Sequence, residues 1–348
     1  MTIETPSPIR QALVLVGGRG TRMWPLTAST PKSLLPLAGR PFLEHQVSQL
    51  GDAGVDEVVL AVGVDQVAAW EAYLASAPSG PRLSLAVEDR PLDTAGAVMA
   101  VLDRMDDRFL VLNGDVIFTT AIARFVAAAP SAGAVLALAQ VPDPSAYGVV
   151  VLDDDGRVER FVEKPAPGTA PADTVNAGLY IVERRALEDF EPGPLSFERR
   201  VFPELAARKD LAGVVVDGGW LDIGTPHLYL DTHERVQADT PHLAADDAHV
   251  VGRRSGSWSY VGAGASIEAE AEVRESVVLA GATIAQGAVV RRSIVGRNAV
   301  IGAGARVIDH VIVGEDAVVG AGCELHAGIR VAPGIELGER SITVRPPR

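Results

Sequence analysis

Glycines, two arginines and a lysine follow a short apolar run in the segment VLVGGRGTRMWPLTASTPKSLLP, residues 14–36. Main chain approaches phosphate oxygens closely at glycine, so the backbone N–H groups of Gly17–Thr21 could hold a triphosphate. Arg22 would add a bidentate guanidinium, and Lys32 would add a compact positive charge. Since none of these groups is an activated nucleophile, the segment predicts a phosphate-binding loop rather than a reacting centre.

Two familiar phosphate-binding motifs do not fit this loop. A P-loop requires the pattern GxxxxGK[ST], whereas Lys32 follows the glycines only after a long gap. A dinucleotide-binding loop requires GxGxxG, but Met23 stands where a third glycine would follow Gly18 and Gly20. The sequence therefore predicts a phosphate-binding loop of another kind.

Two aspartates stand at the ends of other apolar runs, Asp115 in LNGDVIF and Asp222 in GGWLDIGTP. Two separate carboxylates suit Mg²⁺, which prefers one or two carboxylates together with phosphate oxygens. Taken singly, each aspartate also fits a turn or a helix cap. Beside a phosphate-binding loop, the pair predicts a Mg²⁺ site.

Two further segments offer groups for a second substrate. Glu163 and Lys164 in FVEKP point to opposite faces if the segment is extended, and Asn176 interrupts the apolar run TVNAGLYIV. Lys164 could bind a second phosphate, while Glu163 and Asn176 could bind hydroxyl groups. The alternatives are a surface ion pair and a turn.

The composition excludes several classes of protein. A net charge of −14 over 348 residues argues against nonspecific binding to nucleic acid or to anionic membranes. The longest apolar stretches have the length of strands, and the N-terminus lacks a signal peptide pattern, so we expect no membrane span and no export. A single cysteine, Cys323, excludes an internal disulfide and favours a cytoplasmic location.

Up to about residue 235, buried apolar runs alternate with amphipathic stretches. We expect strands at 12–18, 57–63, 109–115 and 134–141, and helices at 42–54 and 94–105. This alternation predicts an α/β domain with a doubly wound, mostly parallel, Rossmann-like sheet. Ligands of such sheets bind outside the carboxyl ends of the strands, where the glycine motifs 17–20 and 113–115 both lie.

From about residue 260 the apolar period changes to six. Thirteen hexads begin with an aliphatic residue or alanine, with one four-residue interruption, RRSI. Such hexapeptide repeats wind into a left-handed parallel β-helix, in which Cys323 falls on a small core position. We therefore expect a catalytic domain at 1–240, a linker at 241–259 and a β-helix domain at 260–348.

The motifs GGRGTRMWPLT…PK, NGD, EKP, NAGLY and WLDIGTP occur in the same order as in the nucleotide-sugar pyrophosphorylases, or sugar-1-phosphate nucleotidylyltransferases. The resemblance covers almost the whole chain, because many members carry a hexapeptide-repeat β-helix after the catalytic domain. It implies the Mg²⁺-dependent reaction of a nucleoside triphosphate with a sugar 1-phosphate to give an NDP-sugar and pyrophosphate. The sugar phosphate would attack the α-phosphorus in line.

The resemblance also implies a role for each motif. Arg22 would hold the leaving β- and γ-phosphates, Lys32 would neutralise charge near the α-phosphate, and Lys164 would bind the sugar phosphate. The remaining implied contacts are Gly17, Gly18, Gly20 and Thr21 with nucleotide, Gly114, Gly148, Glu163 and Asn176 with the sugar phosphate, and Asp115 and Asp222 with Mg²⁺.

The segments LVGG, which includes Val16, and EDRPLDTAGA resemble those of mannose-1-phosphate guanylyltransferases. We therefore expect GTP as the nucleotide, with Val16, Asp93, Thr94 and Gly96 lining its pocket. Asp93 stands where the family usually has glycine. It could bind the base or ribose, or cap a helix that begins at Thr94.

Several alternatives stay open at this point. The same reaction could use another nucleoside triphosphate, or another hexose, heptose or cyclitol 1-phosphate. Hexapeptide β-helices also occur in acyltransferases that use a histidine base, for which His310 and His326 are candidates. A non-catalytic regulatory relative is a third class. We expect homo-oligomers through the β-helix, because its faces and ends favour symmetric packing.

Overall fold

The computed structural model describes residues 8–76 and 79–343. Residues 1–7, on which the expected absence of a signal peptide rests, and residues 344–348, the end of the expected β-helix domain, lie outside the described residues. No helix within the described ranges has the length and the apolar character needed to cross a membrane.

The described chain divides into two compact units that differ from the domains we expected. The first, which we call the sheet unit, contains residues 8–18 and 43–221. The second, the β-helix unit, contains residues 19–42 and 222–343, so it includes most of the loop that the sequence predicts to bind phosphate. The break after Gly18 lies inside the loop that the sequence assigned to a single catalytic domain.

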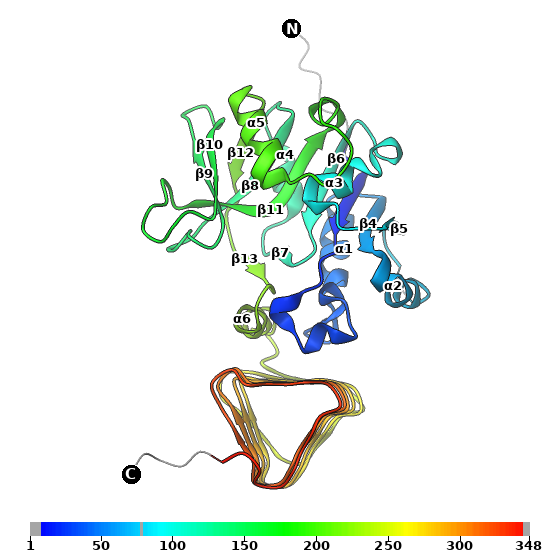
Figure 1. Ribbon diagram of the computed structural model, residues 1–348, viewed down its shortest axis with the longest axis vertical. Helices are drawn as coiled ribbons and strands as arrows, with labels where there is room; N and C mark the ends of the chain where they lie inside the picture. The colour runs from blue at the N-terminus through cyan, green and yellow to red at the C-terminus, as the bar shows by residue number, and fades with distance from the viewer. Residues whose placement is uncertain (1–7, 77–78, 344–348) are drawn as a thin grey trace. The chain divides into compact units, whose positions relative to one another are not determined.

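The sheet unit is built on a sheet with nine strands among the described residues (Figure 1). The strands are β1 (Gln11–Leu15), β4 (Glu57–Gly63), β5 (Arg82–Glu88), β6 (Arg108–Asn113), β8 (Ala134–Gln140), β9 (Gly148–Leu152), β10 (Val158–Glu163), β11 (Thr174–Glu183) and β12 (Leu211–Val215). Neighbours β5, β4, β1 and β6 run parallel, as do β8 and β12. Strand β11 is antiparallel to β6 and β8, and β9 pairs antiparallel with β10.

Short helices accompany this sheet. They are α1 (Phe42–Asp52), η4 (Val64–Gln66), α2 (Val67–Leu74), α3 (Asp93–Met99), η5 (Leu102–Arg104), α4 (Ile122–Ala128), η6 (Arg184–Ala186), the π-helix η7 (Phe197–Val201) and α5 (Phe202–Ala207). Strand β7 (Val116–Phe118) pairs with β13 (Trp220–Asp222). The helix expected at 94–105 ends at Met99, because Val101 leaves the helical region (φ −125°, ψ 12°) before the η5 turn.

The β-helix unit begins with the loop, which forms the 3-10 turns η1 (Thr21–Met23), η2 (Leu26–Ala28) and η3 (Lys32–Leu34). A hairpin of β2 (Pro36–Leu37) and β3 (Arg40–Pro41) follows. After the sheet unit, α6 (Pro226–Val236) begins at Thr225, whose hydroxyl accepts the Leu228 N–H at 3.3 Å.

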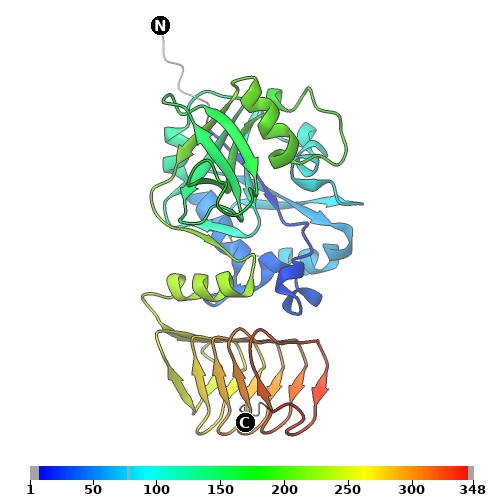
Figure 2. The same cartoon turned by 60° about the vertical axis from the view of Figure 1, so that its left-hand side comes forward.

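Three parallel sheets then form the β-helix, whose triangular outline is visible in Figure 1 and whose stacked coils appear in Figure 2. The first sheet contains β14 (His242–Ala244), β17 (Ser259–Val261), β20 (Val277–Val278), β23 (Ile294–Val295), β26 (Ile312–Val313) and β29 (Arg330–Val331). The second contains β15 (His249–Val250), β18 (Ser266–Ile267), β21 (Thr283–Ile284), β24 (Val300–Ile301), β27 (Val318–Val319) and β30 (Glu336–Leu337). The third contains β16 (Arg253–Ser255), β19 (Glu272–Arg274), β22 (Val289–Arg291), β25 (Arg306–Ile308) and β28 (Glu324–Leu325).

The structure corrects the linker and the hexad register. Strands β14, β15 and β16 occupy the expected linker at 241–259 and pair in parallel with the next coil, so they form a first coil of the β-helix. The fully buried aliphatic residues Val273 and Val278 are five residues apart, and so are Val290 and Val295. The repeat therefore contains two five-residue sides instead of the single four-residue interruption RRSI. A coil can close with one shortened side because its buried core positions stay filled.

The core of the β-helix alternates large and small buried residues. Cys323 is fully buried among them, as its place in the repeat predicts. Paired strands in neighbouring coils are offset by 17 residues, as in Val278 with Val295, or by 18, as in Val295 with Val313. Because the offset varies by only one residue, no inserted loop of the kind that would accompany acyl transfer lies beside His310 in the described coils.

Candidate functional site

The predicted phosphate-binding loop and the NGD motif leave the same edge of the sheet. Strands β1 and β6 are parallel neighbours in which Leu15 pairs with Asn113, and the Gly114 N–H donates to the Leu15 carbonyl at 3.0 Å. Both motifs therefore follow the carboxyl ends of adjacent strands, as the sequence pattern predicted. This edge is where a nucleotide would meet the sheet.

Gly17 lies beside Gly63 and Glu88 at this edge. A Cβ added to Gly17 would lie 3.4 Å from the Gly63 nitrogen and 3.7 Å from the Oε2 of Glu88. A Cβ added to Gly18 would meet nothing within 4 Å. Val16 is only 5% exposed, and its N–H donates to the Ala61 carbonyl at 3.1 Å.

The rest of the loop folds back on itself within the β-helix unit. Gly20 has φ +57°, and Thr27 donates its hydroxyl to the Gly20 carbonyl at 2.9 Å. A Cβ added to Gly20 would lie 3.2 Å from the Cβ of Lys32. Gly20 and half-buried Lys32 are therefore close in space despite their separation in sequence. Helix η1 begins directly after Gly20, and Arg22 is its second residue.

Asp222 lies next to Arg22 in the same unit. A Cβ on Gly224 would lie 2.8 Å from the Oδ1 of Asp222 and 3.1 Å from the Nη2 of Arg22, so both side chains flank Gly224. The Gly224 N–H donates to the Asp222 carboxylate. Thr232 on α6 donates its hydroxyl to the Asp222 carbonyl at 3.0 Å. A turn and a helix thus position this carboxylate.

Gln46 supports the turn that holds Asp115. Gln46 is fully buried on α1, and its Nε2 donates to the carbonyls of Asn113 at 2.8 Å and Val116 at 2.7 Å. These two carbonyls flank Gly114 and half-buried Asp115. No sequence pattern indicated this role, because a glutamine in an amphipathic helix is ordinarily a surface residue.

The EKP motif ends β10 and faces the start of β9. Glu163 pairs with Gly148 across these strands, and Lys164, with φ +44°, donates its N–H to the Tyr147 carbonyl at 3.0 Å. The Lys164 ammonium lies 2.9 Å from the Oε1 of Glu163. A Cβ on Gly148 would lie 3.0 Å from the Oε2 of Glu163 and 2.5 Å from the Cζ of Phe161. Glycine is therefore needed at 148 to admit these side chains.

Asn176 belongs to a polar group at the start of β11. Its Nδ2 donates to the Tyr180 hydroxyl at 2.9 Å, and its Oδ1 accepts the Gly178 N–H at 2.9 Å. Gly178 has φ +77°, and a Cβ there would lie 2.8 Å from the Nδ2 of Asn113. Complete burial raises the pKa of Tyr180 well above its usual value, so this hydroxyl stays protonated.

Two aromatic residues that the sequence did not single out as ligands lie beside the EKP motif. The rings of Tyr147 and Trp220 meet edge to face with centroids 5.1 Å apart. Within the described part of the chain, the buried Trp220 Nε1 and the buried Oε2 of Glu163 have no hydrogen-bond partner. A donor and an acceptor left unpaired in one region are what a hydroxyl-bearing ligand would satisfy.

The PLDTAG segment differs in part from expectation. Asp93 is exposed with φ +61°, and its Oδ1 accepts the Thr94 N–H at 2.9 Å. Helix α3 begins at Asp93 rather than Thr94, and the side chain caps no N–H further along the helix. Asp93 therefore supports only its neighbour.

Two other residues of this segment, Thr94 and Gly96, make internal contacts. The Thr94 hydroxyl donates to Glu198 at 2.8 Å and accepts the Phe197 N–H at 2.9 Å. Gly96 is buried, donates its N–H to the Leu195 carbonyl at 2.9 Å, and would clash with the Gly193 carbonyl if it carried a Cβ. Tight packing explains glycine at 96 without a nucleotide.

Glu88, at the end of β5, is a second residue that sequence reasoning missed. Its Oε2 lies near Gly17 and accepts the Leu92 N–H at a long 3.4 Å. Partial burial raises the pKa of this carboxyl above its ordinary value, while the Leu92 hydrogen bond opposes the rise. The side chain keeps acceptor capacity for a ligand beside the glycine loop.

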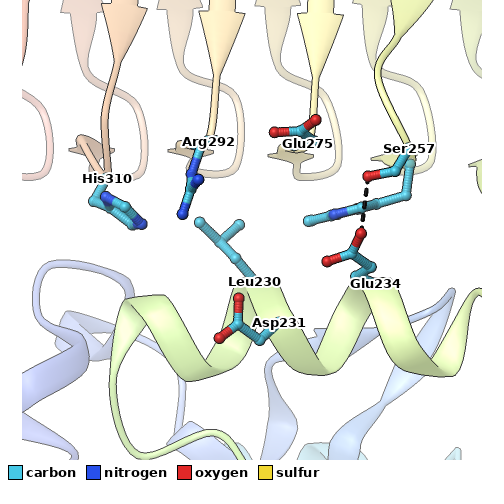
Figure 3. A pocket seen from close by; sticks show the side chains of 8 residues that line it. Leu230, Asp231, Glu234, Ser257, Glu275, Arg292 and His310 are labelled. Atoms are coloured by element: carbon cyan, nitrogen blue, oxygen red, sulfur yellow. Dashed lines mark hydrogen bonds between the residues drawn. The ribbon is translucent and has the colours of Figure 1, made fainter.

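A cavity of about 230 Å³ lies elsewhere, between α6 and the corners of the β-helix (Figure 3). Its lining mixes acids and bases: Leu230, Asp231, Glu234, Ser257, Trp258, Glu275, Arg292 and His310. It contains none of the residues that the sequence predicted for nucleotide, sugar phosphate or Mg²⁺, although it includes His310, the candidate base for acyl transfer. Within the described ranges, no set of three or more His, Cys, Asp or Glu residues is arranged to hold a metal.

Two family models match the chain. Residues 11–239 match the model described as nucleotidyl transferase, and residues 243–343 match the GMPPB C-terminal domain. The probable mannose-1-phosphate guanylyltransferase 1 of Oryza sativa subsp. japonica is 38% identical over 258 residues, which cover 70% of each chain. Mannose-1-phosphate guanylyltransferase 1 of Arabidopsis thaliana is 36% identical over 262 residues, again 70% of each chain.

Two solved structures are also similar. HddC from Yersinia pseudotuberculosis complexed with GMP-PN has a TM-score of 0.57 and 25% identity, covering 66% of this chain and 100% of that one. A putative glucose-1-phosphate thymidylyltransferase from Bacillus anthracis, in complex with a sucrose, has a TM-score of 0.58 and 26% identity. That likeness covers 65% of this chain and 94% of the other.

Proposed function

We propose that this chain, which belongs to the nucleotidyl transferase family, makes GDP-mannose and pyrophosphate from GTP and mannose 1-phosphate. Relatives named mannose-1-phosphate guanylyltransferases support the choice of both substrates. The enzyme class is a sugar-1-phosphate nucleotidylyltransferase.

The observation that carries the choice of guanine is Glu88 beside Gly17. Guanine presents two adjacent donors, N1–H and the 2-amino group, and a carboxylate accepts from both. Adenine presents an acceptor next to its single donor group, and the pyrimidines of UTP and dTTP present one N–H between two carbonyls. A carboxylate would therefore repel part of each of these other bases.

The proposed reaction needs two anions to be held together. An oxygen of mannose 1-phosphate attacks the α-phosphorus, the new P–O bond replaces the α–β bond, and pyrophosphate leaves. The amides of Gly17–Thr21 and the Arg22 guanidinium would hold the triphosphate, and Lys32 would neutralise the α-phosphate. Lys164 would hold the sugar phosphate. Catalysis would then rest on positioning and charge neutralisation, without a covalent intermediate.

Asp115 and Asp222 suit Mg²⁺ as the metal of this reaction. Both are half-buried carboxylates at strand ends, each positioned by neighbouring backbone or side-chain hydrogen bonds. Mg²⁺ in nucleotide sites takes one or two carboxylates and completes its shell with phosphate oxygens and water, so it needs no larger cage. When bound there, the ion would neutralise charge at the phosphates.

The unpaired Glu163 Oε2 and Trp220 Nε1 support a hexose as the second substrate. The absence of a side chain at Gly148 lets the Glu163 carboxylate and the Phe161 ring lie against its backbone. We expect Glu163 and Asn176 to bind hydroxyl groups of the sugar while Lys164 binds its phosphate.

The test is a pyrophosphate-release assay with GTP, ATP, UTP, CTP and dTTP, each against mannose, glucose, galactose and fucose 1-phosphates. We expect the highest kcat/KM for GTP with mannose 1-phosphate. Activity confined to dTTP or ATP would overturn the guanylyl assignment and leave the mechanism intact. Absence of pyrophosphate release with every pair would favour a non-catalytic relative.

We further propose that the enzyme acts in the cytoplasm as a homo-oligomer assembled through the β-helix. The end strands β28, β29 and β30 each have a neighbour on only one side within the described residues, which favours symmetric packing. Sedimentation of the full chain at micromolar concentration tests this, and a monomer would contradict it.

A further inference from the structure

The phosphate-binding loop is hydrogen-bonded to the β-helix in two places. Arg330, on β29, donates from Nη1 to the Trp24 carbonyl at 2.7 Å. Ser29 donates its hydroxyl to the carboxylate of Glu315, in the corner between β26 and β27. All four residues belong to the β-helix unit. Two neighbouring coils thus hold one loop.

These two hydrogen bonds hold the part of the loop that carries the Arg22 guanidinium. Trp24 directly follows η1, on which Arg22 lies, and its N–H donates to the Thr21 carbonyl at 3.2 Å. Ser29 directly follows η2, and Thr27 on η2 donates to the Gly20 carbonyl. A shift at Trp24 or Ser29 would therefore displace Gly20 and Arg22.

Helix α6 supports the far end of the same segment. The Tyr229 hydroxyl donates to the Pro36 carbonyl, and the Nε2 of His233 lies 3.1 Å from that carbonyl. Figure 3 shows α6 facing the β-helix corners, where Ser257 donates its hydroxyl to Glu234 at 2.8 Å. The loop is therefore supported by the β-helix directly and through α6.

We propose that Arg330 and Glu315 are positioning residues for the triphosphate, through which the β-helix holds Gly20 and Arg22 in their binding geometry. This inference rests on the proposed function, because it takes the loop to be the triphosphate site. Groups that bind a transferring phosphate must be held within a fraction of an ångström by rigid neighbours. Short 3-10 turns provide little rigidity alone, so the β-helix supplies it.

A merely structural role predicts a different result. Exposed hydrogen bonds that only joined two surfaces would change thermal stability, or would lower the affinities for both substrates alike. A positioning role predicts a change confined to the nucleoside triphosphate. The ratio of the two KM values therefore separates the roles.

The test uses the full chain with Arg330→Met, Glu315→Ala and the conservative Arg330→Lys. Arg306→Met, an exposed arginine on β25 of the same β-helix, is the matched control. For each variant, pyrophosphate release gives KM for GTP and for mannose 1-phosphate, calorimetry gives the Kd for GTP, and thermal denaturation gives Tm.

We expect Arg330→Met and Glu315→Ala each to raise KM and Kd for GTP about tenfold, the effect of losing one charge-assisted hydrogen bond. KM for mannose 1-phosphate and Tm should stay at the wild-type values, and Arg330→Lys should recover most of the GTP affinity. Equal changes in both KM values, or an unchanged Kd for GTP, would overturn the proposal. Wild-type inactivity with GTP would instead defeat the proposed function, and the same variants would then be compared with whichever triphosphate the wild type binds.

Discussion

Replacing Glu88 by glutamine tests whether this side chain reads the base. The substitution keeps the size of the side chain but exchanges one acceptor oxygen for an NH₂ donor, which would face a donor of guanine. A bidentate contact to a base discriminates by about 1–3 kcal/mol. Because Glu88 is only half-buried, water weakens the contact, and we take about 1–2 kcal/mol. This corresponds to a loss of roughly 5- to 30-fold.

The assay compares kcat/KM for GTP, ITP and ATP, each with mannose 1-phosphate. ITP has the N1–H of GTP but lacks the 2-amino group, so it removes one of the two donors. We expect the wild type to prefer GTP to ITP and to ATP, and Glu88→Gln to reduce both preferences. Glu71→Gln, an exposed glutamate on α2, is the control.

The pH dependence provides a second readout of the same carboxyl group. Burial raises the pKa of Glu88, so as the pH falls this carboxylate gains a proton at a higher pH than an exposed glutamate would. Preference for GTP should therefore be full at neutral pH and decline on acidification, and the glutamine variant should lack this decline. An active Glu88→Gln enzyme with the wild-type GTP to ITP ratio would refute the reasoning.

Three further changes test other parts of the structure. Gln46→Leu removes both hydrogen bonds to the turn at Asp115 and should lower kcat by about tenfold or more, with Tm measured alongside to detect unfolding. Lys164→Ala should raise KM for mannose 1-phosphate and leave KM for GTP unchanged; an unchanged sugar-phosphate affinity would contradict its role. Ile301→Ala, in the fully buried core of the β-helix, should lower the free energy of unfolding by about 2–5 kcal/mol in urea denaturation. A loss below about 1 kcal/mol would show that this core can collapse around the cavity.

Local sequence signals predicted the main elements and the family. The run at 57–63 coincides with β4, and the glycine motifs follow β1 and β6 because glycine ends apolar strands where the chain must turn. The family matches confirm the resemblance drawn from five ordered motifs. The hexad pattern likewise predicted the β-helix.

The same local patterns were misleading at irregular places. The expected linker at 241–259 forms the first coil, because a terminal coil packs against only one neighbour and has a weaker apolar repeat. The hexad register failed between Val278 and Val290, since a five-residue side preserves the buried positions while breaking the count. Asp93 resembled a helix cap by residue type but adopts a left-handed conformation at the first residue of α3.

The sequence by itself determined which chemical groups we propose for the site: glycine amides, Arg22, Lys32, the two aspartates and Lys164, each marked by its neighbours along the chain. Only the tertiary structure decided what supports them. Gln46 reaches Asn113 across 67 residues, and Arg330 reaches Trp24 across 306. Such partners are separated along the chain and meet only when sheet order and coil stacking bring them together. A single side chain carries no sign of the carbonyl it will face until those elements have packed.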